Sequence, residues 1–189
     1  MPHKITIQPK EFFDEEHNRF INVKETTLVL EHSLISISKW EAKYKKPFLV
    51  EGSLSNGAEV LDYIKFMTIT PQNVDDNVYY GLTKENIEEI VKYINDPMTA
   101  TWFSDDKKKP QNKRKKEILT SEVIYWQMIA LEIPQAYEKW HLNRLLTLIR
   151  VCSAKQEEQM GNNKLSKKDI MKRNSALNAQ RRARLGSKG

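Results

Sequence analysis

Cysteine is nearly absent from this sequence of 189 residues, in which Cys152 is the single example. No disulfide can therefore form within the chain, which is typical of proteins that work in a reducing compartment. No stretch approaches the roughly 18–20 apolar residues that are needed to cross a bilayer. The first residues also lack an apolar run of the kind found in signal peptides. We therefore expect a soluble, cytoplasmic protein that does not enter a membrane.

Motifs that bind nucleotides, metals or acyl groups are also missing from the sequence. There is no Walker loop, no GxGxxG pattern and no GxSxG pattern. The four histidines are not spaced as metal ligands, and His141 has no HxxxH or HExxH partner. We interpret His141 as a structural or surface residue. We expect no catalytic residue, no cofactor and no metal ion, and hence a protein that is not an enzyme.

Charge is distributed unevenly along the chain, and apolar residues make up only 39% of it. The C-terminal segment Lys164–Gly189 has nine Lys or Arg residues and one Asp, a net charge of +8. Because the total is +6, the rest of the chain has a net charge of −2. A second cluster, Lys107–Lys116, contains seven basic residues. A mildly acidic body with two basic appendages differs from a uniformly basic nucleic-acid-binding protein.

Three interpretations of the basic tail are open. Lys and Arg can neutralise the phosphates of a nucleic acid, but the tail has no aromatic residue to stack on bases, which disfavours this partner. The tail can also be a solvated extension, or an arm that folds on an acidic protein. The candidate partner contacts in the tail are Lys167, Lys168, Lys172, Arg173, Arg181, Arg182 and Arg184.

The first 33 residues predict a small antiparallel sheet of about three strands. Ile5 and Ile7 alternate with polar residues, which is a strand pattern. Two apolar groups in Glu11–Val23 flank the polar segment Asp14–Asn18, which favours a hairpin. Thr26–Ser33 is rich in β-branched residues and predicts the third strand.

The residues from 34 to 156 predict a mainly helical region. Ser33, Asn56 and Thr83 are suited to cap helices. Two short β-prone segments flank the internal basic cluster, and we expect them to form extended arms around a charged loop. The expected helices are Leu34–Tyr44, Asn56–Met67 and Glu85–Asp96, and the expected arms are Thr99–Ser104 and Glu117–Ser121.

Two apolar helical segments, Ser121–Ile133 and Pro134–Cys152, predict an αα-hairpin at the centre of the domain. Pro134 suits the first turn of the second helix and ends the first helix at about Glu132. An apolar face this wide is seldom covered by one neighbour, so part of it can form a surface for a partner. The candidate partner contacts in the hairpin are Trp126, Met128, Tyr137 and Trp140.

These patterns predict an α+β fold in which a small N-terminal antiparallel sheet precedes a mainly helical region with a central αα-hairpin. We expect one domain over residues 1–156, with the sheet in residues 1–33 and the helices in residues 34–156. Residues 157–189 are expected to be a linker and a basic tail that is helical or disordered, with the linker at Gln156–Lys164.

Several segments of the chain resemble proteins encoded in the tail gene clusters of siphophages. The likeness covers most of the chain, and its segments are core and tail segments rather than catalytic motifs. They are LEHSLISISKWE (Leu30–Glu41), PMTATWF (Pro97–Phe103), KWHLNRLLTLI (Lys139–Ile149) and RNSALNAQRR (Arg173–Arg182).

This resemblance implies a tail assembly chaperone of the host bacterial cytoplasm. Such a protein is expected to bind the long, helical tape measure protein and keep it soluble while tail tube subunits polymerise around it. The major tail protein and a second copy of the chain are further candidate partners. Two other functions stay open, namely a structural component of the virion, such as a connector or tail-completion protein, and a nucleic-acid-binding protein that uses the basic tail.

Overall fold

The structure, a computed structural model, describes residues 2–15, 18–70, 74–101, 103, 118–162, 171 and 175. It confirms the predicted α+β class, because four N-terminal strands form antiparallel pairs and the later elements are helices. The chain divides into two units, Met1–Ile149 and Arg150–Gly189. The four strands belong to the first unit.

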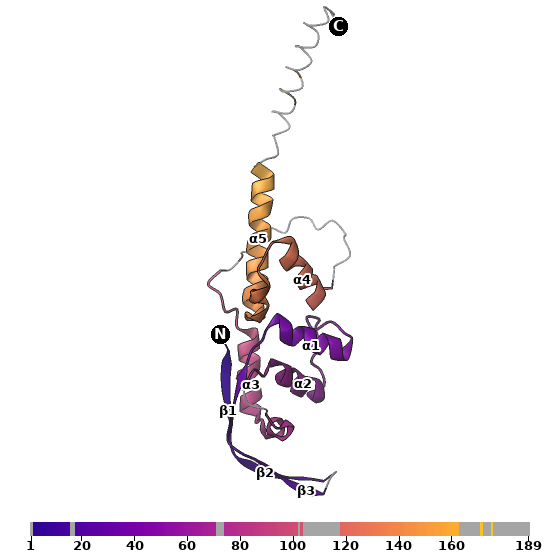
Figure 1. The fold of residues 1–189 in the computed structure, drawn as a ribbon, viewed down its shortest axis with the longest axis vertical. Coiled ribbons are helices and arrows are strands. Elements are labelled where there is room, and N and C mark those ends of the chain that lie inside the picture. The colour runs from indigo at the N-terminus through magenta and orange to yellow at the C-terminus, as the bar shows by residue number, and fades with distance from the viewer. Residues whose placement is uncertain are drawn as a thin grey trace, which may run out of the picture. The chain divides into compact units, whose positions relative to one another are not determined.

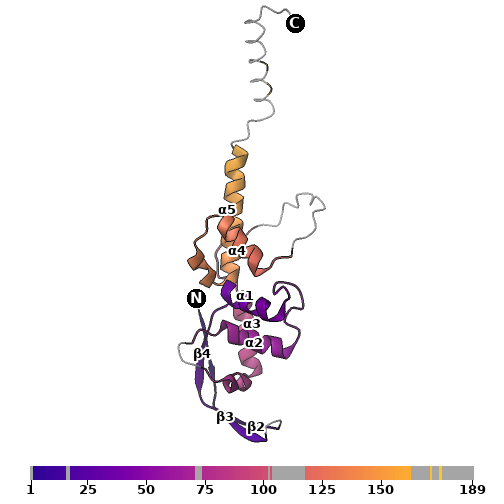
Figure 2. The ribbon, with the colours of Figure 1, turned by 45° about the vertical axis from the view of Figure 1, so that its right-hand side comes forward.

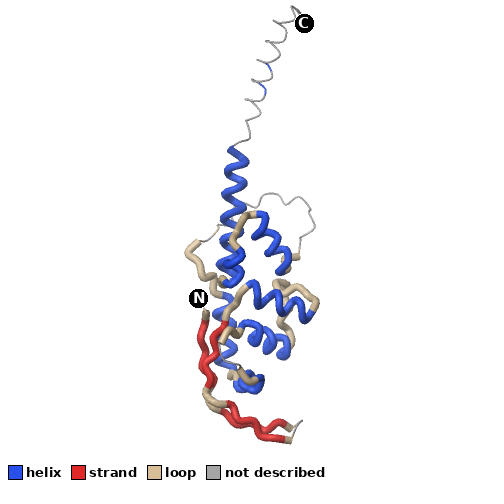
Figure 3. The backbone as a smooth tube through the Cα atoms, in the orientation of Figure 1, coloured by secondary structure: helices blue, strands red, loops and turns tan. Residues whose placement is uncertain are grey.

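The four strands form one bent ribbon (Figures 1 and 3). They are β1 (His3–Ile7), β2 (Lys10–Asp14), β3 (Arg19–Val23) and β4 (Thr26–Leu30). β1 pairs with β4, and β2 pairs with β3, so the β2–β3 hairpin continues the β1–β4 pair. His3 faces Leu30 and Lys10 faces Val23, so both arms advance by the same seven residues between the two pairs. The register therefore continues through the bend without an inserted residue.

One face of this ribbon belongs to the core, because side chains alternate along a strand. Its buried residues are Ile5, Ile7, Ile21, Val23, Leu28 and Leu30. The short 3-10 helix η1 (Asp76–Gly81) packs against β3. A Cβ atom on Gly81 would lie only 2.9 Å from Cγ2 of Ile7, so this approach requires glycine.

The predicted hairpin in Glu11–Val23 is confirmed, but the sheet differs from the predicted one in two ways. It has four strands in two pairs instead of about three strands. The last strand ends at Leu30, and Ser33 instead forms an isolated bridge with His141. Periodicity predicts strands but not which strands pair, and the nested pairing became visible only in three dimensions.

The helices follow the ribbon in chain order (Figure 2). The predicted capping residues are confirmed at all three helix starts. The main-chain N–H of Ser33 donates to Ser36 Oγ, Asn56 accepts a bond from Ala58 N, and Thr83 accepts one from Asn86 N. The remaining elements are α1 (Leu34–Tyr44), α2 (Gly57–Met67), α3 (Lys84–Asn95), α4 (Ser121–Ala130), the 3-10 helix η2 (Gln135–Lys139) and α5 (Leu142–Asn162).

The helix with the most extensive packing is α1, which contacts α2, α4 and η2. It lies between α2 and α4 in both ribbon views (Figures 1 and 2). Leu34, Ile37 and Trp40 recur on one side of α1 and have no exposed surface. The prediction that the αα-hairpin lies at the centre of the domain is therefore wrong, and α1 has that place.

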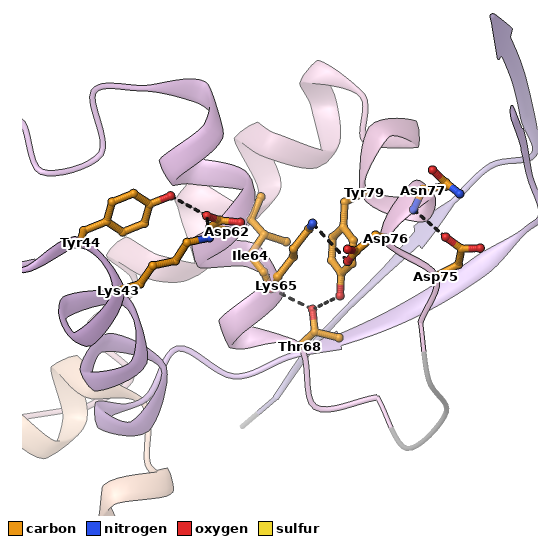
Figure 4. Close-up of polar contacts among 10 residues, drawn as sticks. All are labelled: Lys43, Tyr44, Asp62, Ile64, Lys65, Thr68, Asp75, Asp76, Asn77 and Tyr79. Carbon is orange, nitrogen blue, oxygen red and sulfur yellow. Dashed lines mark hydrogen bonds and ion pairs between the residues drawn. The ribbon is translucent and has the colours of Figure 1, made fainter. Parts of the chain in front are cut away.

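Polar contacts hold α2 between α1 and η1 (Figure 4). The carboxylate of Asp62 accepts hydrogen bonds from the ammonium group of Lys43 and from the hydroxyl of Tyr44, the latter at 2.5 Å. At the far end of α2, the hydroxyl of Tyr79 donates to Thr68 Oγ1 over 3.0 Å. The side chain of Lys43 is 51% exposed, and ion pairs of this kind contribute little free energy.

The predicted αα-hairpin is only partly correct. α4 begins at Ser121 as expected, but Pro134 precedes η2 and does not lie in the first turn of a long helix. α5 begins eight residues later, at Leu142, and continues to Asn162. Residues 156–162, which were predicted as linker, are therefore helical.

The predicted extended arms do not form strands in the residues that the structure describes. Residues 99–101, 103 and 118–120 are in neither strand nor helix, and Ser121 is the first residue of α4. Thr120 caps α4, because its Oγ1 accepts a hydrogen bond from Val123 N. Most of the charged loop, residues 104–117, lies outside the described residues.

A buried carboxylate joins α4 to the first part of the domain. Glu41 in α1 is 8% exposed. Its Oε1 accepts the main-chain N–H of Phe48, and its Oε2 accepts that of Ser121, both at 2.8 Å. Ser121 is 80 residues away in the sequence and opens α4, where unpaired N–H groups favour a negative charge. Glu41 therefore fixes the N-terminus of α4 against α1.

Substitutions of Glu41 measure how much this link contributes to the free energy of unfolding. In Glu41→Ala, two buried N–H groups lose their acceptor, and we expect the free energy of unfolding to fall by roughly 3 kcal/mol. Glu41→Gln keeps one acceptor oxygen and should lose about half as much. Urea unfolding monitored by circular dichroism measures both changes. The exposed Glu51→Ala is the control, and equal losses in Glu41→Ala and Glu51→Ala would contradict the assignment.

Candidate functional site

The helix α4 has apolar residues on both its buried and its exposed faces. Ile124 and Met128 point into the core, with Met128 only 2% exposed. On the opposite side, Trp126 is 66% exposed and Ile129 is 77% exposed. These two residues are three positions apart and are therefore neighbours on the helix surface. We call Trp126, Ile129 and the exposed Ala130 the α4 face.

Local backbone chemistry holds the C-terminal end of the α4 face. The N–H of Ile133 donates to the carbonyl of Met128 over 2.8 Å, and that of Glu132 donates to Ile129 over 3.1 Å. This pair of bonds is a Schellman motif. Glu132 takes the left-handed position (φ 54°) that such a motif usually gives to glycine. Met128 and Ile133, at the positions where the motif usually has an apolar pair, are both buried.

A stack of planar groups follows in η2 and the start of α5. The rings of Tyr137 and Trp140 are nearly parallel, with centroids 4.0 Å apart. The guanidinium carbon of Arg144 lies 4.1 Å from the ring centroid of Trp140, a cation–π arrangement. Both aromatic residues are half-buried, so most of their area is already used within the fold.

The predicted partner residues therefore separate into three groups. Trp126 is exposed, as a partner contact requires, whereas Met128 is a core residue and was wrongly assigned to a surface. Tyr137 and Trp140 are intermediate and contact each other. The tail residues lie outside the described residues, namely Lys167, Lys168, Lys172, Arg173, Arg181, Arg182 and Arg184.

Ile129 was not recognised from the sequence as a surface residue. It is absent from the predicted partner contacts, although it lies on the same helix as Trp126. The signal that could have found it was the spacing of three from Trp126, but a helix that is apolar on nearly every side does not show which side faces the protein.

A cavity of about 450 Å³ lies at the N-terminal end of α4. Glu122, Lys45 and Lys46 are among its lining side chains. Lys46 is engaged, because its ammonium group lies 2.8 Å from Glu59 Oε1. The volume is in the range of small-molecule sites, but such sites are mostly apolar and these walls carry several charged groups. Glu122 lines the cavity and lies four residues before Trp126, which is one helical turn away. The cavity therefore adjoins the α4 face.

A cluster of buried polar rings lies elsewhere in the same unit. His32 and His141 are each 2% exposed, and their ring centroids are 4.9 Å apart. Nδ1 of His32 lies 2.5 Å from the hydroxyl of Tyr63. The main-chain N–H of His32 donates to the hydroxyl of Tyr93 over 3.3 Å. Each of these buried polar groups therefore has a partner, as stability in a core requires.

His141 caps α5 with its side chain. Its Nδ1 accepts a hydrogen bond from the N–H of Asn143 over 3.3 Å, and its Nε2 lies 3.0 Å from the carbonyl of Tyr93. A carbonyl can only accept, so Nε2 carries the hydrogen and Nδ1 is bare. The two contacts therefore select one neutral tautomer. A second proton on Nδ1 would break the cap and place a positive charge at the positive end of the helix.

The environment keeps these rings neutral near pH 7. Burial, aided by the neighbouring His141, lowers the pKa of His32 to about 3. Burial also lowers the pKa of His141, against the opposite effect of its hydrogen bond to the Tyr93 carbonyl. Burial raises the pKa of the Tyr63 and Tyr93 hydroxyls. An imidazole with a pKa near 3 is a poor proton acceptor at pH 7, so this cluster is suited to support the fold.

Neither a metal-binding cluster nor a membrane-spanning helix is found in the part of the chain that the structure describes. No three His, Cys, Asp or Glu side chains within it are grouped so that they could hold a metal ion. None of its helices has an apolar stretch long enough to cross a bilayer.

Comparison of the chain with protein-family models, with curated proteins and with solved structures finds no match.

The buried histidines predict a loss of stability in mild acid. The unfolded chain protonates His32 below about pH 6.5, whereas the folded chain keeps it neutral down to about pH 3. The unfolded chain thus binds more protons in this window, so stability is lost as the pH falls from 6.5 towards 3. His32 should account for a decrease on the order of 2 kcal/mol in the free energy of unfolding between about pH 6.5 and 5.0.

The variant His32→Gln isolates this contribution. Its stability at about pH 6.5 will be lower because the core is repacked, but its further decrease to about pH 5.0 should be smaller than that of the wild type by about the same 2 kcal/mol. Urea unfolding at both pH values gives the difference. An equal decrease in the two proteins would show that His32 is not held neutral by the fold.

Proposed function

We propose that this chain is a non-enzymatic tail assembly chaperone of a siphophage, which binds the tape measure protein through the α4 face. The observation that carries the proposal is the exposure of Trp126 and Ile129 on a helix that is otherwise well anchored. The resemblance to proteins of siphophage tail gene clusters supports the choice of client, by which we mean the polypeptide that the chaperone binds.

Exposed apolar side chains on a rigid helix suit such a client. A long helical protein presents apolar stripes until its partners cover them, and a chaperone protects them by covering them first. Burying one large apolar side chain contributes roughly 1.5–3 kcal/mol. Two such anchors with a polar surround give a modest interface that can dissociate again, as a chaperone that leaves the finished tail requires.

The basic tail is a second contact in this proposal. Residues Lys167, Lys168, Lys172, Arg173, Arg181, Arg182 and Arg184 would bind acidic surfaces of the same client or of the major tail protein. A second contact on the same chain raises the effective concentration of the first without enlarging either interface. The site of action would be the host bacterial cytoplasm, where the client is made.

Co-expression with the tape measure protein of the same gene cluster tests the proposal. We expect the chaperone to raise the soluble fraction of the tape measure protein and to co-purify with it. The double variant Trp126→Ser/Ile129→Ser removes both anchors and should reduce co-purification at least about tenfold, because each tenfold corresponds to about 1.4 kcal/mol. Quantitative blotting of the eluates measures the ratio.

The matched control is Val91→Ser on α3, which removes an apolar side chain that is 48% exposed elsewhere in the same unit. It should co-purify with the client as the wild type does. A tape measure protein that stays insoluble and is not retained by the wild-type chain would refute the proposed function.

A further inference from the structure

The segment that carries the α4 face has charged residues of one sign. Between Ile118 and Glu138, a range that the structure describes throughout, there are three glutamates and no Lys, Arg or Asp. They are Glu122, Glu132 and Glu138. The exposed apolar residues therefore lie within a segment of net charge −3.

The glutamates are placed at both ends of the face. Glu122 is four residues before Trp126 and is exposed, so it lies on the same side of α4 one turn away. Glu132 lies two residues after Ala130, the last residue of α4, and is exposed as well. Glu138 is half-buried, and its Oε2 accepts a hydrogen bond from the hydroxyl of Tyr125 over 3.0 Å. Two carboxylates thus remain open to a partner.

The charge of Glu122 is secured by the helix itself. Hydrogen bonds from the main chain at Glu122 and from Thr120 hold the pKa of its carboxyl below the usual value. Basic groups reach this end of the face from α1, where Lys45 and Lys46 line the neighbouring cavity. Lys46 is paired with Glu59, so it adds little free positive charge.

The backbone of α4 restricts the form of the partner. The N–H and C=O groups in the middle of a helix are already bonded to each other, so α4 offers side chains and no strand edge. An apolar segment that packs on it must satisfy its own backbone groups, and a helix does this internally. Helices also pack ridge into groove through residues spaced three and four apart, which is the spacing of Trp126, Ile129 and Ala130.

We propose that the α4 face binds an amphipathic helical segment whose apolar stripe is flanked by Lys or Arg residues. The apolar stripe covers Trp126 and Ile129, and the basic flanks lie against Glu122 and Glu132. This inference rests on the proposed function and specifies the chemistry of the client segment. It commits to a segment of another protein, and the chain's own basic segments and a second copy are alternative occupants that the experiment separates.

Two labelled peptides test the charge preference on the full chain. Each has about 18 residues with leucine at helical i, i+3, i+4 and i+7 spacing, one with lysine flanks and the other with glutamate flanks. Fluorescence anisotropy at low salt should give a Kd about tenfold lower for the lysine peptide, and this ratio should fall towards one as salt is raised to about 0.5 M. Equal affinity of the two peptides at low salt would overturn the inference.

Matched variants assign the preference to particular residues. Glu122→Gln/Glu132→Gln should reduce the tenfold preference to about twofold, while Glu88→Gln, an exposed glutamate of α3, should leave it unchanged. Trp126→Ser/Ile129→Ser should weaken the binding of both peptides by about the same factor. Circular dichroism confirms that each variant is folded. A preference that survives the double glutamine variant would place the basic flanks elsewhere and overturn the assignment.

The alternative occupants have their own readouts. A synthetic peptide of residues 164–189 that competes as strongly as the lysine peptide would show that the chain's own tail is the occupant. Sedimentation of the full chain as a dimer that Trp126→Ser/Ile129→Ser dissociates would show that a second copy covers the face. Either result overturns the assignment to a client.

Failure of this inference is distinguishable from failure of the proposed function. In one outcome, the tape measure protein co-purifies, and its retention depends on Trp126 and Ile129 but not on Glu122 and Glu132. That outcome supports the chaperone function and refutes the inference that the client segment has basic flanks. If the peptides show the charge preference but the tape measure protein is not retained, the face has the stated chemistry and the client is another protein.

Discussion

The carboxylate of Glu41 links two regions of the chain that lie 80 residues apart, and the position of α4 depends on this link. Its two oxygens accept main-chain N–H groups from Phe48 and Ser121, so one buried charge closes the loop after α1 and anchors the first turn of α4. The α4 face is useful as a binding surface only if it is rigid, because a mobile helix would lose entropy when a partner bound. By fixing α4, the buried carboxylate of Glu41 therefore supports a binding surface on the outside of the protein.

The histidine and tyrosine cluster performs a comparable task on another side of the unit. His32 follows β4, Tyr93 lies in α3, and His141 precedes α5, so the hydrogen bonds among them join the ends of three elements. Rings held neutral by burial can do this without the cost of burying charge. The fold thus uses polar groups as connectors between elements while helix α1 supplies the apolar centre.

The features that could be predicted from the sequence depend on residues close together in the chain. Ser33, Asn56 and Thr83 were recognised as caps because a cap involves residues two or three positions away. The start of α5 was missed because its cap is a histidine, an uncommon residue there, whose tautomer is set by a carbonyl in α3. The end of α4 was misplaced because Glu132 takes a backbone conformation that usually indicates glycine.

The candidate site was predictable to a similar extent. Trp126 could be selected because a large aromatic side chain on a helix that is apolar on nearly every side suggests a surface for a partner. The same reasoning included Met128, which is in the core. Periodicity cannot distinguish two sides of a helix that are equally apolar. The acidic surround of the face was present in the sequence, yet it has meaning only once Glu122 and Trp126 are known to lie on one side.

The unbroken register of the β ribbon constrains how this protein can change in length. His3 faces Leu30 and Lys10 faces Val23, so the bend consumes equal numbers of residues on both arms. An insertion or deletion in one arm would have to be matched in the other to preserve pairing. It would also have to comprise an even number of residues, since an odd number would turn Ile5 and Ile7 away from the core. Viable descendants of this sequence should therefore vary in length at the hairpin tip more readily than along either arm.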